Sequence, residues 1–220
     1  MLPILIEACV ESLAAATAAR AGGAGRIELC ASLDAGGLTP DDALVLACVE
    51  ELEIPVAVMI RPRPGSFVLR AGELEGMLAV VRRMRHLGAA GVVLGALTPA
   101  GTIDRPALRA LVEAASGLPV VFHRAFDEIE DQSAALEELI ALGVSRVLTS
   151  GAATTAWEGA ERIALLVRQA AGRIGIVAGG SVRAHNAGEL VTRTGVSELH
   201  SRTPDDAEAV RELVRAANSS

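Results

Sequence analysis

Two cysteines near the start of the chain each follow a glutamate by two residues, in Glu7-Ala8-Cys9 and Glu28-Leu29-Cys30. Residues two apart share a face of a strand, so each segment would present a carboxylate and a thiol on the same side. On neighbouring strands the two thiols would lie roughly 4.8 Å apart laterally, and two thiolates that close could hold one soft ion such as Cu(I). The alternative is that both cysteines are small core hydrophobes, and the spacing alone favours that interpretation.

Two histidines stand at the ends of predicted strands. His123 and His200 could serve there as general acids or bases, with Glu28 or Asp127 nearby, or as metal ligands. The alternative is that they are hydrogen-bonded core histidines. We expect the remaining histidines to be surface residues on helices: His86 and His185.

Guanidinium groups and glycines at other strand ends suggest an anion site. Arg61-Pro62-Arg63 would place two guanidinium groups at one rim, where they could bind a carboxylate or phosphate. The alternative is that they form ion pairs with Glu7 and Glu28. Free amides at a helix start favour phosphate, and barrels often build phosphate sites after strands seven and eight. The residues that could supply such amides and hydroxyls are Ser150, Gly151, Gly179 and Gly180.

Three charged residues of the first two predicted strands have two possible roles. Glu7, Arg26 and Glu28 could contact a ligand directly. They could equally form a salt-bridged layer inside the fold, since buried charges are costly unless they are paired or bind something.

The elements that position these residues alternate regularly along the chain. Short β-type runs begin near residues 4, 27, 56, 92, 120, 147, 174 and 197, about 28 residues apart, with helical patterns between them. This spacing predicts a single (β/α)8 barrel over residues 1–220, with the polar strand ends gathered at one mouth. An open doubly wound sheet is the alternative. Thr39-Pro40-Asp41-Asp42 and Thr203-Pro204-Asp205-Asp206 each predict a helix start, with threonine as the N-cap.

Composition excludes several functions. All 20 basic residues are arginine, so Schiff-base chemistry through lysine is excluded. The net charge of −7 argues against nucleic-acid and anionic-membrane partners. No apolar run is long enough to cross a membrane and no leader is evident, so we expect a cytoplasmic protein with reduced cysteines. Without a CxxC pair no zinc site is expected, and Cys48 should pack within a helix. The apolar composition is compatible with homo-oligomers.

Seven segments in order along the chain resemble the CutC family. They are GAGRIELC at 23–30, GGLTP at 36–40, MIRPR at 59–63, FHRAFD at 122–127, VLTSG at 147–151, AGG at 178–180 and ELH at 198–200. The resemblance spans about residues 4 to 201, and FHRAFD and MIRPR are its most specific parts. It implies a cytoplasmic TIM-type barrel associated with copper homeostasis, in which the proposed copper-binding cysteines correspond to Cys9 and Cys30.

The sequence departs from the family pattern at a few places. Pro64-Gly65-Ser66-Phe67 stands where the family typically has Gly-Gly-Asp-Phe, and the segment after His200 is much shorter than in long members.

The candidate residues and the resemblance together suggest two functions. The first is Cu(I) binding by the cysteines. The second is an enzyme acting on a small anionic or phosphorylated metabolite, with arginines holding the anion and His123 transferring a proton.

Overall fold

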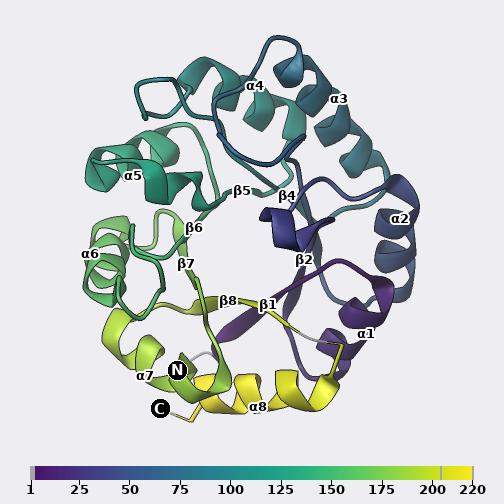
Figure 1. Cartoon of the computed structure of the whole chain (residues 1–220), viewed down its shortest axis with the longest axis vertical. Helices are drawn as coiled ribbons and strands as arrows, with labels where there is room; N and C mark the ends of the chain where they lie inside the picture. Colours follow the sequence, from purple (N-terminus) through teal and green to yellow (C-terminus); the bar gives the residue numbers. More distant parts are fainter. Residues whose placement is uncertain (1–2, 204, 220) are drawn as a thin grey trace.

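The computed structural model describes residues 3–203 and 205–219. Eight parallel strands pair in sequence order, and the last pairs with the first, so the sheet is a closed barrel (Figure 1). The strands are β1 (Leu5–Val10), β2 (Arg26–Leu29), β3 (Val56–Met59), β4 (Gly91–Leu94), β5 (Val120–Phe122), β6 (Arg146–Thr149), β7 (Gly175–Gly179) and β8 (Glu198–Arg202).

A helix follows each strand and covers the outside of the barrel (Figure 1). Two short 3-10 turns, η1 (Leu33–Ala35) and η2 (Arg124–Glu128), lie in the loops after β2 and β5. None of the described helices has the length and hydropathy needed to span a membrane. The helices are α1 (Leu13–Ala21), α2 (Asp42–Glu51), α3 (Glu73–His86), α4 (Arg105–Ala115), α5 (Gln132–Ala141), α6 (Ala160–Ala170), α7 (Ala184–Thr194) and α8 (Ala207–Ala217).

The predicted (β/α)8 barrel is confirmed, and every strand begins within one residue of its predicted start. The alternative of an open doubly wound sheet is wrong, because β8 pairs with β1 over five residues. The predicted threonine cap of α2 is also wrong. That helix begins at Asp42, and the Asp41 side chain accepts the hydrogen bond from the Leu44 amide, because an aspartate one residue before the helix is the better-placed acceptor.

The corresponding prediction for the last helix is corrected in the same way. Pro204 lies outside the described residues, but α8 begins at Ala207 and its N-cap is Asp206 rather than Thr203. In both segments the N-cap of the helix therefore lies two or more residues after the predicted threonine, at an aspartate that can cap the helix.

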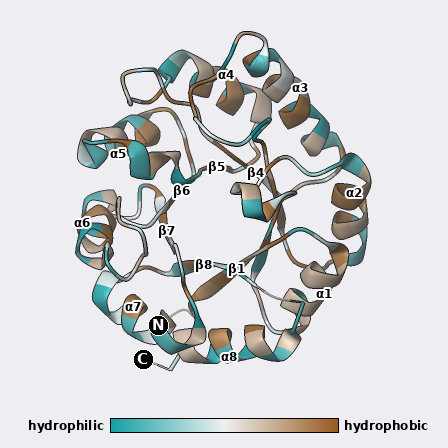
Figure 2. Ribbon diagram, viewed as in Figure 1, coloured by the Kyte–Doolittle hydropathy of each residue, from teal (hydrophilic) through white to brown (hydrophobic). Residues whose placement is uncertain are grey.

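The strands divide their side chains between two cores. Alternate residues such as Ile6, Ala8 and Val10 face the helices and join the large outer core. The others fill the barrel with a small apolar cluster, which includes Met59, Val121 and the two cysteines Cys9 and Cys30. Most strands are hydrophobic, and the polar residues of β8 stand out against them (Figure 2). Charge inside the barrel is therefore concentrated around β8, β1 and β2.

Candidate functional site

A layer of paired charges lies inside the barrel below the site. The register sets Glu7 opposite Arg26 on one side and His200 on the other. Arg26 Nε donates to Glu7 Oε2 at 2.5 Å, and its Nη2 donates to Glu198 Oε2 at 2.6 Å. Arg146, at the start of β6, completes the layer at 3.1 Å from Glu198. Glu7 and Arg26 therefore form a salt bridge, as the second interpretation of the sequence expected. A direct ligand role for these residues stays a prediction.

His200 connects this layer to the cysteines. Its Nδ1 lies 2.8 Å from Glu7 Oε1 and 3.9 Å from Glu28 Oε2. Burial opposes a charge on His200, but the neighbouring Glu28 and the hydrogen bonds to Cys9 and Glu7 outweigh it and hold the pKa of His200 well above its usual value. Glu7 is buried as well, yet the hydrogen bond from His200 and the charges of His200 and Arg26 lower its pKa to about 2. The structure therefore contains a buried imidazolium–carboxylate pair.

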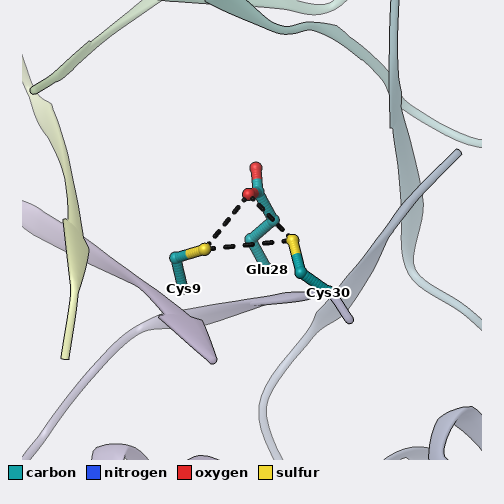
Figure 3. A group of neighbouring side chains, drawn as sticks. All are labelled: Cys9, Glu28 and Cys30. Atoms are coloured by element: carbon teal, nitrogen blue, oxygen red, sulfur yellow. Dashed lines mark hydrogen bonds between the residues drawn. The ribbon is translucent and has the colours of Figure 1, made fainter. Parts of the chain in front are cut away.

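Cys9, Glu28 and Cys30 form a triangle inside the barrel (Figure 3). The two sulfurs are 3.9 Å apart, and Glu28 Oε1 lies 3.4 Å from Cys9 Sγ and 3.5 Å from Cys30 Sγ. Cys9 is 5% exposed and Cys30 is fully buried. The other carboxylate oxygen, Glu28 Oε2, is buried and has no hydrogen-bond partner among the described residues. Apart from the 3.9 Å ion-pair contact with His200, this oxygen is therefore available to a ligand.

The surroundings keep both thiols protonated. The hydrogen bond to Cys30, burial and the negative charge of Glu28 raise the pKa of Cys9 well above its usual value. For Cys30 the hydrogen bond with Cys9 lowers the pKa, but burial and Glu28 outweigh it and bring the pKa to about 11. Burial is also the first reason why the pKa of Glu28 is raised. All three groups are therefore less acidic than in water, and a cation would have to displace the protons of the two thiols.

The spacing of the two cysteines suits a shared metal ion better than a disulfide. Cys9 pairs with Glu28 in the parallel ladder, so Cys30 is its diagonal neighbour. A lateral spacing of roughly 4.8 Å and a rise of about 6.6 Å over two residues place their Cα atoms about 8 Å apart. A disulfide needs less than about 7 Å. Two thiolates can share one ion when their sulfurs are no farther apart than twice a metal–sulfur distance of roughly 2.3 Å, and the 3.9 Å separation meets that condition.

His123 lies apart from this triangle. Its Nδ1 accepts the hydrogen bond from the Ala125 amide, its Nε2 is buried without a partner among the described residues, and its ring is 4.7 Å from that of Phe67. Burial, and then the charge of Arg61, lower the pKa of His123 to about 3. The imidazole is therefore neutral, with its proton on the Nε2 that lacks a partner. A catalytic role for His123 stays a prediction.

Arg61 and Arg63 are engaged by other groups than those the sequence suggested. The predicted ion pairs with Glu7 and Glu28 are wrong: Arg61 donates to backbone carbonyls, of which Gly36 O at 3.0 Å and Gly65 O at 2.9 Å are the nearest. Arg63 forms its salt bridge with Glu73 on α3, at 2.7 Å. Strand parity does not reveal these partners, because they are loop carbonyls for Arg61 and the first residue of α3 for Arg63.

Asp127 fastens the loop after β6 instead of facing His123. Its carboxylate accepts hydrogen bonds from Thr149 Oγ1, the Ser150 amide and hydroxyl, and the Ala152 amide. It also pairs with Arg124 at 2.8 Å. With five donors around one carboxylate, Asp127 and Ser150 have little capacity left for a ligand. Their predicted catalytic and binding roles are untested.

The predicted phosphate glycines lie where backbone and side chains approach closely. A Cβ on Gly151 would be 2.5 Å from Gly159 O, and one on Gly179 would be 2.6 Å from Leu148 Cδ1. Gly180 has a φ of 118° and accepts, through its carbonyl, the Ala156 amide. Packing therefore accounts for these glycines, and phosphate binding stays a prediction.

Sequence reasoning missed two contributors to the site. Arg146 stands one residue before the predicted strand start at 147, but it belongs to β6 and shares the inward face with Leu148. The segment after β2, to which the sequence assigned no role at the site, lies against Cys30: a Cβ on Gly37 would be 3.2 Å from its sulfur. The expectations for the other residues agree with their burial: Cys48 is fully buried, and both remaining histidines are exposed on helices, His86 and His185.

Comparison with known proteins identifies the family. The model of the CutC family matches residues 4–204. The chain belongs to the CutC family. A CutC family protein from Xanthomonas axonopodis pv. citri is 51% identical over 195 residues, 89% of this chain and 81% of that protein, and one from Vibrio cholerae is 47% identical over 197 residues. The crystal structure of the putative copper homeostasis protein CutC from Streptococcus agalactiae has a TM-score of 0.85 and 39% identity, covering 90% of this chain and 97% of that one.

More distant structures share only the barrel with this CutC family member. Phosphoribosylanthranilate isomerase from Thermotoga maritima has a TM-score of 0.64 at 11% identity. A likeness at that identity establishes the fold and carries no function.

Proposed function

We propose that this chain binds Cu(I) through Cys9 and Cys30, with Glu28 as the third ligand, and acts in copper homeostasis. The observation that carries the proposal is the triangle of two sulfurs 3.9 Å apart with one carboxylate oxygen 3.4 and 3.5 Å from them. Thiolates are the soft ligands that Cu(I) prefers. The second oxygen of Glu28 has no hydrogen-bond partner among the described residues, only the ion-pair contact with His200 at 3.9 Å, which leaves the carboxylate room to turn toward an ion.

The protonation of the site defines how binding would proceed. Because the pKa values of both thiols are raised, a Cu(I) ion has to replace their protons, and affinity should increase with pH. Protonated, buried thiols are poor nucleophiles and resist oxidation. This chemistry fits a reducing compartment such as the cytosol.

The second function, an enzyme acting on a small anionic metabolite, has less support. Its anion-binding arginines are engaged by backbone carbonyls and by Glu73. Asp127, one of the two carboxylates suggested as partners of His123 in proton transfer, is occupied by the loop after β6. We therefore favour Cu(I) binding over an enzymatic function on an anionic metabolite.

Removing both thiols should abolish high-affinity Cu(I) binding. We expect the wild type to take up one Cu(I) per chain in an anaerobic titration against a chromogenic Cu(I) chelator, and Cys9→Ser/Cys30→Ser to take up none. The matched control is Cys48→Ser, since Cys48 is equally buried but lies on α2, away from the barrel interior. Equal uptake by the wild type and the double variant would contradict the proposal.

Replacing the third ligand should weaken binding without abolishing it. Glu28→Gln keeps the shape but removes the anionic oxygen, so we expect the Cu(I) dissociation constant to rise at least roughly tenfold, the scale seen for shell substitutions at metal sites. Glu198→Gln alters another carboxylate of the barrel interior that pairs with Arg26 and Arg146 rather than with sulfur. Its affinity should stay close to that of the wild type; if both variants bind alike, Glu28 is no ligand.

A further inference from the structure

The buried cysteines raise the question of how an ion reaches them. Cys30 is fully buried and Cys9 is 5% exposed. A cavity of about 360 Å³ opens beside them at the ends of β1 and β8, but its walls are formed by Val10, Glu11, Leu33 and their neighbours and include neither cysteine. Access therefore requires part of the chain to move.

The segment after β2 closes the mouth above the cysteines. It contains η1, the short dark turn drawn inside the ring beside β2 in Figure 1. Leu33 packs on the apolar cluster inside the barrel. Gly37 lies so close that a Cβ there would be 3.2 Å from Cys30 Sγ, and its φ of 81° keeps the backbone in that position. Residues 32–37 are thus the layer between Cys30 and the outside.

This segment is shaped as a compact loop with a narrow base. Ala31 and Leu38 exchange two backbone hydrogen bonds, of 2.8 and 2.7 Å, and close the loop at its ends. Within it Ser32, Gly36 and Gly37 all have positive φ. A non-glycine residue in that region carries backbone strain. A loop whose ends lie close together is a compact unit, and segments with few contacts can open locally without global unfolding.

Few bonds hold the loop down, and Arg61 supplies most of them. Its Nη1 donates to Gly36 O at 3.0 Å, Gly37 O at 3.4 Å and Ala35 O at 3.5 Å. Its Nη2 is tied to Gly65 O, and its guanidinium group lies 4.8 Å from the centre of the Phe67 ring. No carboxylate among the described residues pairs with it in a salt bridge. The guanidinium group therefore contacts loop carbonyls and the Phe67 ring.

The remaining bonds are at the surface and weak. Arg202 Nη1 donates to Asp34 at 2.8 Å, where the Asp34 side chain is 91% exposed. The Leu33 amide donates to Glu11 Oε2 at 2.8 Å. Exposed pairs of this kind contribute little to stability, so Arg61 supplies the main polar contacts of the loop, beside the apolar packing of Leu33.

We infer that residues 32–37 form a lid over the Cys9–Cys30 pair and that Arg61 is the positioning residue that latches it. The lid would open locally, admit an ion to the triangle and close over it without unfolding of the barrel. This inference gives the proposed copper site its access route, but it concerns the exposure of two thiols and can be tested with no metal present.

The test is the rate at which each cysteine is alkylated in the native, metal-free protein, resolved by peptide mass spectrometry. Arg61→Gln removes the guanidinium group that donates hydrogen bonds to the lid carbonyls. Cys9 and Cys30 should therefore react at least roughly tenfold faster than in the wild type. Cys48 reacts only when α2 and the outer core open, and its rate should not change. The control is Arg63→Gln, because Arg63 comes from the same rim but is tied to Glu73 rather than to the lid; its rates should match the wild type.

Two alkylation results would overturn the lid. One is unchanged alkylation of Cys9 and Cys30 in Arg61→Gln; the other is an equal acceleration of all three cysteines, which would mean global destabilisation. Hydrogen exchange on the wild type needs no variant: peptides covering residues 31–38 should exchange well before the peptides of β3 and β4, and equal protection would refute local opening. If the lid behaves as expected while the wild type takes up no Cu(I), the lid stands and the copper function falls.

Discussion

Arg26→Met is expected to lower the free energy of unfolding by about 3–5 kcal/mol, the cost of removing one partner from a buried ion pair. Arg26 contacts two carboxylates inside the barrel, and the side chains of Arg26 and Glu7 are 7% and 1% exposed. Methionine fills similar volume but leaves Glu198 with one partner and Glu7 dependent on His200. The measurement is urea denaturation followed by circular dichroism, compared at equal m-values.

Arg146→Met provides the matched comparison for this prediction. Arg146 shares the partner Glu198 but its side chain is 28% exposed, so water can replace it. The expected loss is about 1 kcal/mol or less, in the range of partly exposed pairs. Equal losses for the two variants would show that the charge layer inside the barrel does not depend on Arg26.

Acidification should destabilise the protein through His123. Its pKa is about 3 in the folded protein against 6.5 for a free imidazole, because it is buried and faces Arg61. Between these values the unfolded chain binds a proton that the folded chain does not. This group's contribution to stability is therefore complete above pH 6.5 and is lost as pH falls toward 3, with a slope of at most about 1.4 kcal/mol per pH unit.

His123→Gln should remove that slope while leaving the rest of the pH profile in place. The comparison is best made between pH 6.5 and 4.5, above the range in which the depressed pKa of Glu7 begins to act. His185→Gln is the control, since His185 is exposed on α7. Superimposable profiles of wild type and His123→Gln would show that His123 titrates normally, and would disprove its burial as a neutral base.

Much of the architecture was predictable from periodicity because a closed barrel imposes it. Each β-α unit needs nearly the same length, so eight evenly spaced apolar runs locate the strands. The two-residue spacing of Glu7 with Cys9 and of Glu28 with Cys30 placed all four side chains inside the barrel, which the structure confirms. The alternation of side chains along a strand was enough to predict the orientation of these four residues, because they lie on a strand or directly after one.

The partners of loop residues were not predictable in this way. Arg61 and Asp127 come from segments whose course depends on tertiary contacts, and each bonds to a loop that strand parity cannot place. Thr39 failed as a helix cap because an aspartate two residues later competed for the same role. Arg146 was overlooked because its strand begins one residue earlier than the apolar run. These errors arise where a local sequence pattern, such as strand alternation or a capping motif, competes with a tertiary contact or with a neighbouring residue that suits the role better.

The pairing of β1 with β8 has a consequence for how the protein is made. Glu7 on β1 receives its imidazole partner only from His200, 193 residues later in the chain. During synthesis the cysteine-bearing strands therefore leave the ribosome long before the residues that complete their surroundings, and domains of this size fold as units once enough chain has emerged. A nascent chain would hold two accessible thiols without their finished enclosure, so the cysteine pair is buried only in molecules whose translation has been completed.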